Sequence, residues 1–272
     1  MTPSPSLSAA TATALRNAGP PDVAADARRV LDRCRALVRP GLVAAVERMH
    51  PWLGEMAAYS LGWHEPGGPP PREGAPTATG ASGDSDSGGG KGVRQALAVL
   101  GAEAAGASGE HAVPGAVAVE LVHTFSLLHD DIMDGDETRR QRPTVWKAYG
   151  TGPAVLAGDG IFALAVEVLA ETPGARVGTA VRRLATAQSH LMAGQADDLL
   201  FERRPWGGPD AVRPGEYRTM AEAKTGALLG CAVSLGALLA GAPEATVETL
   251  DRAGRHLGVA FQAADDLLGI WG

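Results

Sequence analysis

The sequence predicts an all-α fold, and three observations support this. Apolar residues return at helical spacing along most of the chain, and few segments show the period-two alternation of a half-buried strand. Aromatic residues make up only 4% of the 272 residues, and alanine, leucine, valine and glycine take their place. Because small side chains let helices approach closely, we expect a core of tightly packed helices. A hydrophobic share of 45% is compatible with one large domain or two small ones.

Residues 1–22 are expected to form a disordered tail, passive or used to dock a partner. They are rich in proline, serine, threonine and alanine, and they lack the apolar segment of a secretory signal. We predict that residues 23–272 form the folded domain. Cys34 and Cys231 are too few and too far apart for a disulfide framework or a metal knuckle, which favours a cytoplasmic location. The net charge of −7 argues against nucleic-acid binding.

The first folded segment, Val23–Trp63, has apolar residues at helical spacing. Proline disrupts a helix interior, so we expect Pro40 to separate two helices and Pro51 to bend or break the second. Residues 65–90 contain eight glycines and five prolines. This composition predicts a flexible loop within the domain.

Four further helices are expected. The apolar pattern indicates helices at 152–170, at 177–200 and from 246 to 272, with a loop over 203–215. Residues 225–243 carry no charge and contain four glycines. A membrane crossing needs about 20 apolar residues, and this shorter, interrupted segment is typical of a buried core helix. No membrane anchor is therefore predicted.

Acidic and basic residues concentrate near the middle of the chain. Asp130 and Asp134 lie one helical turn apart on one side, and His123 lies two turns earlier on that side. Two carboxylates near a protein interior repel unless a cation holds them, and Mg²⁺ prefers oxygen ligands. Arg139 and Arg140 follow in a loop, and guanidinium groups suit phosphate oxygens. Metal and a phosphorylated substrate are indicated together.

Two other interpretations of this acidic cluster compete with a magnesium site. A solvated acidic surface at a helix end remains open. An EF-hand calcium loop is excluded, because Ile132 and Gln141 would occupy positions that need oxygen ligands.

A second cationic pair lies farther towards the N-terminus. Lys91 and Arg94 share a face at the start of a helix, where an anion is favoured. A nucleotide-binding P-loop is excluded, because its glycine spacing and preceding strand are missing. An ordinary surface pair is the alternative.

Two smaller groups complete the polar pattern. Gln262 lies beneath Asp265 and Asp266 on one face of the last helix. Gln195 and Asp198 share a face of an earlier helix, as a solvated pair also would.

These residues together resemble the trans-polyprenyl (isoprenyl) diphosphate synthase family, and most of all its bacterial geranylgeranyl-type members. The resemblance rests on the first aspartate-rich motif, a Gly-Lys-x-x-Arg element, a Gly-Gln-x-x-Asp element, a Lys-Thr pair and a Phe-Gln-x-x-Asp-Asp motif, which comprise His123, Asp130, Asp131, Asp134, Arg139, Arg140, Pro143, Lys91, Arg94, Gln195, Asp198, Lys224, Thr225, Gln262, Asp265 and Asp266. It implies an isoprenoid-synthase-type helical bundle around a central apolar cavity.

The chain departs from the family pattern at several positions. Gly92 and Gln95 stand where the family more often has arginine and proline, and Gly269 replaces a third aspartate. Family members normally continue through a further acid, a Gly-Lys element and closing helices. We therefore expect the domain at 23–272 to lack the usual C-terminal part.

The resemblance implies a head-to-tail prenyltransferase that condenses isopentenyl diphosphate with an allylic diphosphate. It implies Mg²⁺ as cofactor, with three ions between the two aspartate-rich motifs, and a homodimer. The residues expected to act in catalysis are Asp130, Asp131, Asp134, Lys224, Asp265 and Asp266. Direct metal ligands would be Asp130, Asp134 and Asp265, with Asp131, Asp266 and Asp198 as ligands or as supports for them.

The same resemblance distributes the two substrates. Arg139 and Lys224, with Thr225 beside it, would hold the allylic diphosphate. Isopentenyl diphosphate would lie against Lys91, Arg94, His123 and Arg140, and Gln262 is expected to take part in substrate binding.

Product length is expected to depend on Phe125, five residues before the first aspartate, and on Ser126. In the family this combination suggests geranylgeranyl diphosphate. The helical wheel places Ser126 below Asp130 but Phe125 about 140° around the axis. Geometry therefore does not independently support Phe125 as the floor of the pocket.

Two other functions stay open. A class I terpene cyclase would share the fold and the first acid cluster, but its usual later metal motif is replaced here by Gln262, Asp265 and Asp266. The second is a catalytically inactive fragment or partner subunit.

Overall fold

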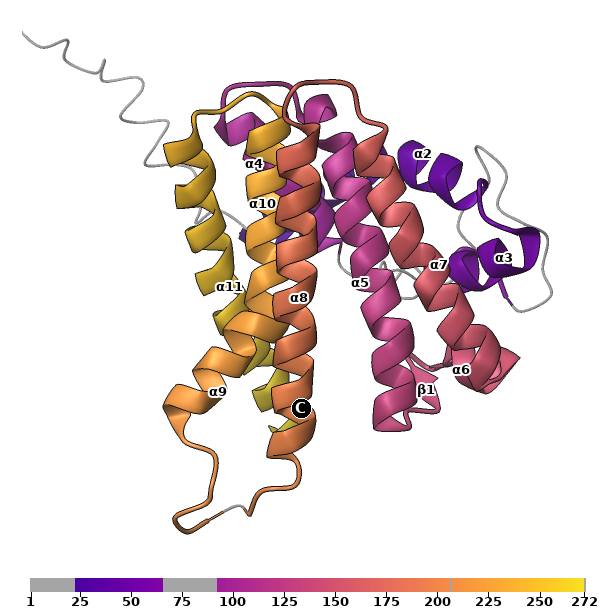
Figure 1. The fold of residues 1–272 in the computed structure, drawn as a ribbon, viewed down its shortest axis with the longest axis vertical. Helices are drawn as coiled ribbons and strands as arrows, with labels where there is room; N and C mark the ends of the chain where they lie inside the picture. Colours follow the sequence, from indigo (N-terminus) through magenta and orange to yellow (C-terminus); the bar gives the residue numbers. More distant parts are fainter. Residues whose placement is uncertain (1–22, 66–91, 206, 272) are drawn as a thin grey trace, which may run out of the picture.

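The computed structural model describes residues 23–65, 92–205 and 207–271, and these confirm the all-α prediction (Figure 1). One short hairpin interrupts the helices. In chain order the elements are α2 (Val23–Val46), α3 (Pro51–Ser60), α4 (Val93–Ala104), η1 (Gly109–Ala112), α5 (Val113–Asp134), β1 (Thr138–Arg139), β2 (Arg142–Pro143), α6 (Val145–Tyr149), α7 (Thr151–Ala170), α8 (Val177–Phe201), α9 (Pro214–Ala221), η2 (Glu222–Gly226), α10 (Ala227–Leu239) and α11 (Glu244–Trp271).

Helix α10 is the centre of the bundle. It contacts α11, α4, α8 and α5, and every residue from Ala227 to Leu238 is buried. Figure 1 shows it between α11 and α8. This confirms the uncharged segment 225–243 as a core helix.

Glycine lets the central backbones touch. A Cβ atom on Gly236 of α10 would lie 1.8 Å from the carbonyl oxygen of Ala98 in α4. A Cβ atom on Gly101 of α4 would lie 2.1 Å from the carbonyl oxygen of Val233. Both separations are far below van der Waals contact, so the α4–α10 interface requires glycine at these positions.

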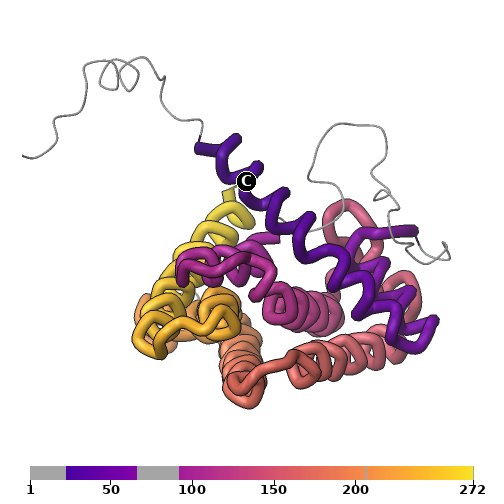
Figure 2. The backbone as a smooth tube through the Cα atoms, turned by 90° about the horizontal axis from the view of Figure 1, so that it is seen from above, coloured from indigo at the N-terminus to yellow at the C-terminus, as the bar shows by residue number. Residues whose placement is uncertain are grey.

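Helix α2 runs along one side of the bundle, transverse to the long helices, and contacts α4 and α5 (Figure 2). Pro40 lies inside α2, so the prediction that it separates two helices was wrong. Val38 and Leu42 on either side are buried, and we attribute the unbroken helix to this continuous apolar face, which offsets the loss of one backbone hydrogen bond. The predicted break at Pro51 is confirmed, since Pro51 opens α3 after the N-cap residue His50.

The other predicted helices are confirmed with small changes at their ends. The segments expected at 152–170, 177–200 and 246–272 correspond to α7, α8 and α11. The loop expected over 203–215 ends at Pro214, where α9 begins. The predicted tail at 1–22 and nearly all of the predicted loop at 65–90 lie outside the described residues.

Three helical segments in the described chain are long and apolar enough to cross a membrane. They are Gly109–Asp134, Thr151–Ala170 and Pro214–Leu239. The first and third bury 72% and 78% of their apolar window within the fold, so the core uses their apolar surface. The second, α7, buries 39% and leaves Val155 and Leu156 exposed.

Candidate active site

The acidic residues predicted to form the site lie at one end of the bundle. Figure 1 shows that α5, α8 and α11 all finish at this end. Gly135, at φ +71°, stops α5 immediately after Asp134. The helix therefore delivers its carboxylates to its last turn.

Asp130 has a carboxylate oxygen that the described part of the protein leaves unsatisfied. Its Oδ1 atom is buried and has no hydrogen-bond partner among the described residues. Burial raises the pKa of Asp130 to about 6, which Lys224 opposes and the nearby Asp134 reinforces. Burial also raises the pKa of Asp134, again against the attraction of Lys224. Both carboxylates of α5 therefore lie within the field of one ammonium group.

Lys224 lies on η2, a single π-helical turn between α9 and α10. Such turns are frequent at functional sites. A Cβ atom on Gly194 of α8 would lie 2.2 Å from the backbone nitrogen of Lys224, so the two backbones touch. This contact brings the Lys224 ammonium to Asp198 on α8, to which it donates a hydrogen bond.

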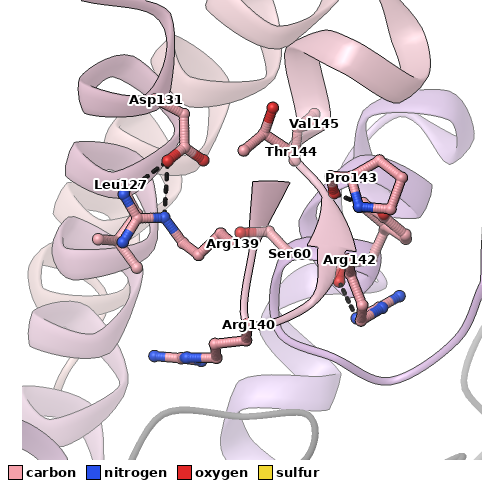
Figure 3. Close-up of a pocket in the computed structure, with 10 residues that line it drawn as sticks. Ser60, Leu127, Asp131, Arg139, Arg140, Arg142, Pro143, Thr144 and Val145 are labelled. Carbon is pink, nitrogen blue, oxygen red and sulfur yellow. Dashed lines mark hydrogen bonds and ion pairs between the residues drawn. The ribbon is translucent and has the colours of Figure 1, made fainter. Parts of the chain in front are cut away.

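Asp131 points into a pocket beside the β1–β2 hairpin (Figure 3). It is 4% exposed, and Arg139 reaches its Oδ1 atom with both Nε and Nη2 at 2.6 Å. Burial raises the pKa of Asp131, and Arg139 opposes the rise. The side chain that we expected on the allylic diphosphate therefore already binds a carboxylate of α5.

The hairpin turn separates the two arginines. Arg140 and Gln141 have φ angles of +51° and +62°, in the left-handed region that residues other than glycine rarely adopt. A two-residue turn of this kind matches the twist of paired strands. Figure 3 shows Arg139 directed to Asp131 and Arg140 projecting away from it.

A second cationic group, from α4, contacts α5 two turns before Asp130. Arg94 of α4 donates from Nη1 to Nε2 of His123 at 3.1 Å. Because arginine only donates, this His123 nitrogen is the acceptor and the ring proton is on Nδ1. Burial, together with Arg94 and Arg140, lowers the pKa of His123 well below 6.5, so the ring is neutral at pH 7.

Helix α11 reaches the site through glycine contacts. A Cβ atom on Gly258 would lie 2.4 Å from the Cα atom of Gly226. One turn later Gln262 accepts a hydrogen bond from Thr225 and donates to Oδ1 of Asp266 at 2.8 Å. The predicted placement of Gln262 beneath the second acid pair is thus observed.

Tyr217 of α9 completes the support of Asp266, with its hydroxyl donating to Oδ2 at 2.5 Å. Burial and Asp266 together raise the pKa of Tyr217. Sequence reasoning missed this residue, although Tyr217 lies two helical turns before Lys224, a spacing that predicts a shared face. Asp266 is held by protein groups on both oxygens, whereas the neighbouring Asp265 is exposed.

Arg94 lies close enough to both acid-bearing helices to sense them, since it donates a hydrogen bond to His123 of α5 and the charge of Asp265 on α11 raises its pKa. The structure therefore brings most of the predicted residues into one region. Those it connects are Arg94, His123, Asp130, Asp131, Asp134, Arg139, Asp198, Lys224, Thr225, Gln262, Asp265 and Asp266. Lys91 lies outside the described residues.

Of the two residues thought to set product length, Phe125 faces α7 and Ser126 bonds within α5. The Phe125 ring lies 4.7 Å from the His129 ring and 5.4 Å from the Phe162 ring, measured between centroids. The Ser126 hydroxyl donates to the carbonyl oxygen of His123. Both residues are buried.

The donor set fits a hard divalent cation. In residues 23–65, 92–205 and 207–271, no three histidine, cysteine, aspartate or glutamate side chains are gathered closely enough to hold a metal ion. The buried, unpartnered oxygen of Asp130, with Asp134 one turn away, nevertheless presents the oxygen chemistry that Mg²⁺ prefers.

Comparison with known proteins agrees with this site. A sequence model of the polyprenyl synthetase family matches residues 81–272. The (2E,6E)-farnesyl diphosphate synthase of Mycobacterium tuberculosis is 45% identical over 243 residues, which are 89% of this chain and 62% of the relative. The geranylgeranyl diphosphate synthase of the same organism is 44% identical over 246 residues, or 90% of this chain and 65% of the relative.

Solved structures give the same picture. A polyprenyl synthetase from Streptomyces coelicolor A3(2) superposes with a TM-score of 0.77 and 52% identity, over 90% of this chain and 67% of that one. A polyprenyl synthase from Caulobacter crescentus, complexed with calcium and isoprenyl diphosphate, gives a TM-score of 0.72 and 29% identity over 90% of this chain and 66% of that one.

The chain belongs to the polyprenyl synthetase family, and it has the all-α fold of those neighbours. It spans 62% to 65% of the length of these two curated relatives.

The raised pKa of Asp130 predicts that Asp130→Asn stabilises the metal-free protein at pH 7.5. The pKa of Asp130 is about 6 in the folded protein and 3.8 in the unfolded chain, so the folded protein holds this proton more tightly. The resulting stabilisation is complete below pH 3.8 and is lost as the pH rises through about 6, so that at pH 7.5 the protein must keep an unfavourable buried charge. The shift is worth about 1–2 kcal/mol once partial solvent screening is allowed for. Urea unfolding in EDTA at pH 7.5 and pH 5 should show the gain at the higher pH and a smaller one at the lower.

Glu103→Gln is the contrasting control, because Arg33 pairs with this carboxylate and lowers its pKa, so removing its charge should lower the free energy of unfolding at both pH values. If Asp130→Asn were no more stable than the unaltered chain at pH 7.5, the carboxylate would not be under electrostatic stress.

Proposed function

We propose that this protein is a head-to-tail prenyltransferase, which condenses isopentenyl diphosphate with an allylic diphosphate and lengthens the chain by five carbons. One observation carries the proposal. Lys224 is paired with Asp198, its charge lowers the pKa of Asp130 and Asp134, and the Arg94–His123 pair lies two turns earlier along α5. Two adjacent charged regions suit two diphosphates.

The allylic diphosphate would bind at the region around Lys224. The Lys224 ammonium and the Thr225 hydroxyl are both on the π turn, which packs against α8 and α11. Arg139, held against Asp131, would add a guanidinium at the edge of the same region. Each of these groups has donors suited to phosphate oxygens.

Isopentenyl diphosphate would bind against Arg94, His123, Arg140 and Lys91. His123 is neutral and its Nε2 atom accepts from Arg94, so the ring orients that guanidinium without competing for its charge. Gln262 would contribute indirectly, because it joins Thr225 to Asp266.

Asp130, Asp134 and Asp265, with Asp198, would hold Mg²⁺, and three ions fit the family pattern. When bound, Mg²⁺ neutralises the charge that develops on the departing pyrophosphate. Asp131 and Asp266 would act mainly as supports, since Arg139 binds one and Tyr217 with Gln262 binds the other.

In the reaction the C1–O bond of the allylic diphosphate breaks, and its electron pair leaves with pyrophosphate. The double bond of isopentenyl diphosphate then forms the new carbon–carbon bond, and a proton passes to pyrophosphate. Lys224 and Arg139 hold the leaving group, Arg94 and His123 hold the nucleophile beside it, and the apolar helices keep water from the cation.

The product is proposed to be geranylgeranyl diphosphate. The curated relatives include both a farnesyl and a geranylgeranyl diphosphate synthase, so family membership supports either length. The burial of Phe125 and Ser126 in α5, one turn or slightly more before Asp130, supports a role for them in limiting the chain.

We further propose a cytoplasmic homodimer. The exposed Val155 and Leu156 on α7 fit an interface between helices of two copies.

The assay for this function combines the chain with radiolabelled isopentenyl diphosphate, farnesyl diphosphate and Mg²⁺. We expect a product five carbons longer than the primer, lost on addition of EDTA. Asp265→Asn, which removes the exposed carboxylate of α11, should lower kcat at least ~100-fold, as loss of a group that stabilises transition-state charge does. Consumption of farnesyl diphosphate alone would indicate a cyclase, and absence of any product an inert subunit.

Phe125→Ala is expected to lengthen the products, because it opens space between α5 and Phe162 of α7. Chromatography of the dephosphorylated products measures this directly. Trp52→Ala, on the exposed surface of α3, is the control and should leave the distribution unchanged. An unchanged distribution in Phe125→Ala would remove this residue from chain-length control.

A further inference from the structure

Glu120 is a buried acid to which the reaction above gives no role. It lies on α5, three residues before His123, and is 8% exposed. Its Oε2 atom is buried and has no hydrogen-bond partner in the part of the chain that the structure describes. Burying an ionised carboxylate costs several kcal/mol unless cations compensate it. Nearby positive charge must therefore stabilise an ionised carboxylate in this position.

The charges of three arginines act on Glu120. Arg94 of α4, Arg140 of the hairpin turn and Arg35 of α2 all lower its pKa, against the larger effect of burial, which raises it. Three elements that are distant in sequence thus direct positive charge at one carboxylate.

Arg94, like Glu120, has a buried polar atom that no described residue satisfies. Its Nε atom is buried and, within the described residues, has no hydrogen-bond partner. Glu120 is the strongest charge acting on it, ahead of Asp265. Its Nη1 atom is already fixed by His123. Glu120 and His123, one helical turn apart on α5, therefore act on Arg94 from neighbouring positions.

The charges suit a diphosphate. Arg35, Arg94 and Arg140 would repel one another if Glu120 were absent, and His123 is neutral. With Glu120 ionised, the group keeps an excess of two positive charges. The Glu120 carboxylate offsets the repulsion among the arginines, and the remaining positive charge attracts the diphosphate.

We propose that Glu120 is the positioning residue of the isopentenyl diphosphate site, where it holds Arg94, and with it Arg140, in the arrangement that binds the diphosphate. The inference rests on the proposed function. Glu120 touches neither substrate and acts through the arginines.

Glu120→Gln tests this, because it removes the charge and keeps the size. We expect KM for isopentenyl diphosphate to rise about tenfold, the scale of one charge-assisted hydrogen bond. We expect kcat and KM for the allylic diphosphate to stay within about twofold. Glu120→Asp, which keeps the charge, should restore part of the loss and also provides the test if Glu120→Gln fails to fold.

Asp251→Asn is the matched control. Asp251 is a partly buried acid of α11 paired with Arg255, 14 residues before Asp265 and thus about 21 Å along the helix. It should lower the free energy of unfolding without changing either KM. If Glu120→Gln instead lowered kcat and raised both KM values together, Glu120 would be a general support of the fold and the proposal would be overturned.

A double substitution tests the pathway through Arg94. In the Arg94→Lys background, Glu120→Gln should raise KM for isopentenyl diphosphate much less than in the unaltered chain, because the group it positions is gone. Fully additive effects would contradict the proposal.

Calorimetric titration of isopentenyl diphosphate into the metal-free protein separates this inference from the proposed function. Weaker binding by Glu120→Gln supports the positioning role even if the unaltered chain yields no product. Equal binding by both proteins overturns the positioning role while leaving the prenyltransferase assignment to its own assay.

Discussion

Repulsion among carboxylates at the end of α5 is the constraint on which the rest of the site depends. Asp130 and Asp134 are one turn apart, and an oxygen of Asp130 is buried without a partner among the described residues. The protein only partly offsets this with Lys224, whose ammonium is shared with Asp198. Such incompletely neutralised charge destabilises the folded protein when no metal is bound. It is also what a site for hard cations needs, since ligands already neutralised by the protein would bind them weakly.

Backbone contacts through glycine bring the parts of this site together. Gly194 lets α8 approach Lys224, and Gly258 lets α11 approach Gly226. Side chains at either position would push these helices apart and move Asp198 or Gln262 away from α10. The small residues that dominate the composition thus have a functional consequence, because close helices allow short polar side chains from four elements to meet.

Much of the fold could be predicted from the sequence, because helical periodicity over long segments is a strong local signal. The prediction for Pro40 was wrong, since it rested on local proline geometry while packing of Val38 and Leu42 depends on distant helices. Most of the predicted acids and bases that the structure describes gather in one region. Their partners were not predictable: nothing local indicates that Arg139 binds Asp131, that Tyr217 holds Asp266, or that the charges of three arginines lower the pKa of Glu120. The first contact depends on the direction of the hairpin, and the others join elements far apart in sequence.

The central claim is that α5 and α11 present their carboxylates to one shared metal and diphosphate site. A crystal structure of the chain with Mn²⁺ and an unreactive allylic thiolodiphosphate tests it most directly, because the anomalous signal locates each ion. The account predicts ions between Asp130 and Asp265 that both contact the diphosphate. Ions bound at one helix only, or a diphosphate away from Lys224, would contradict it.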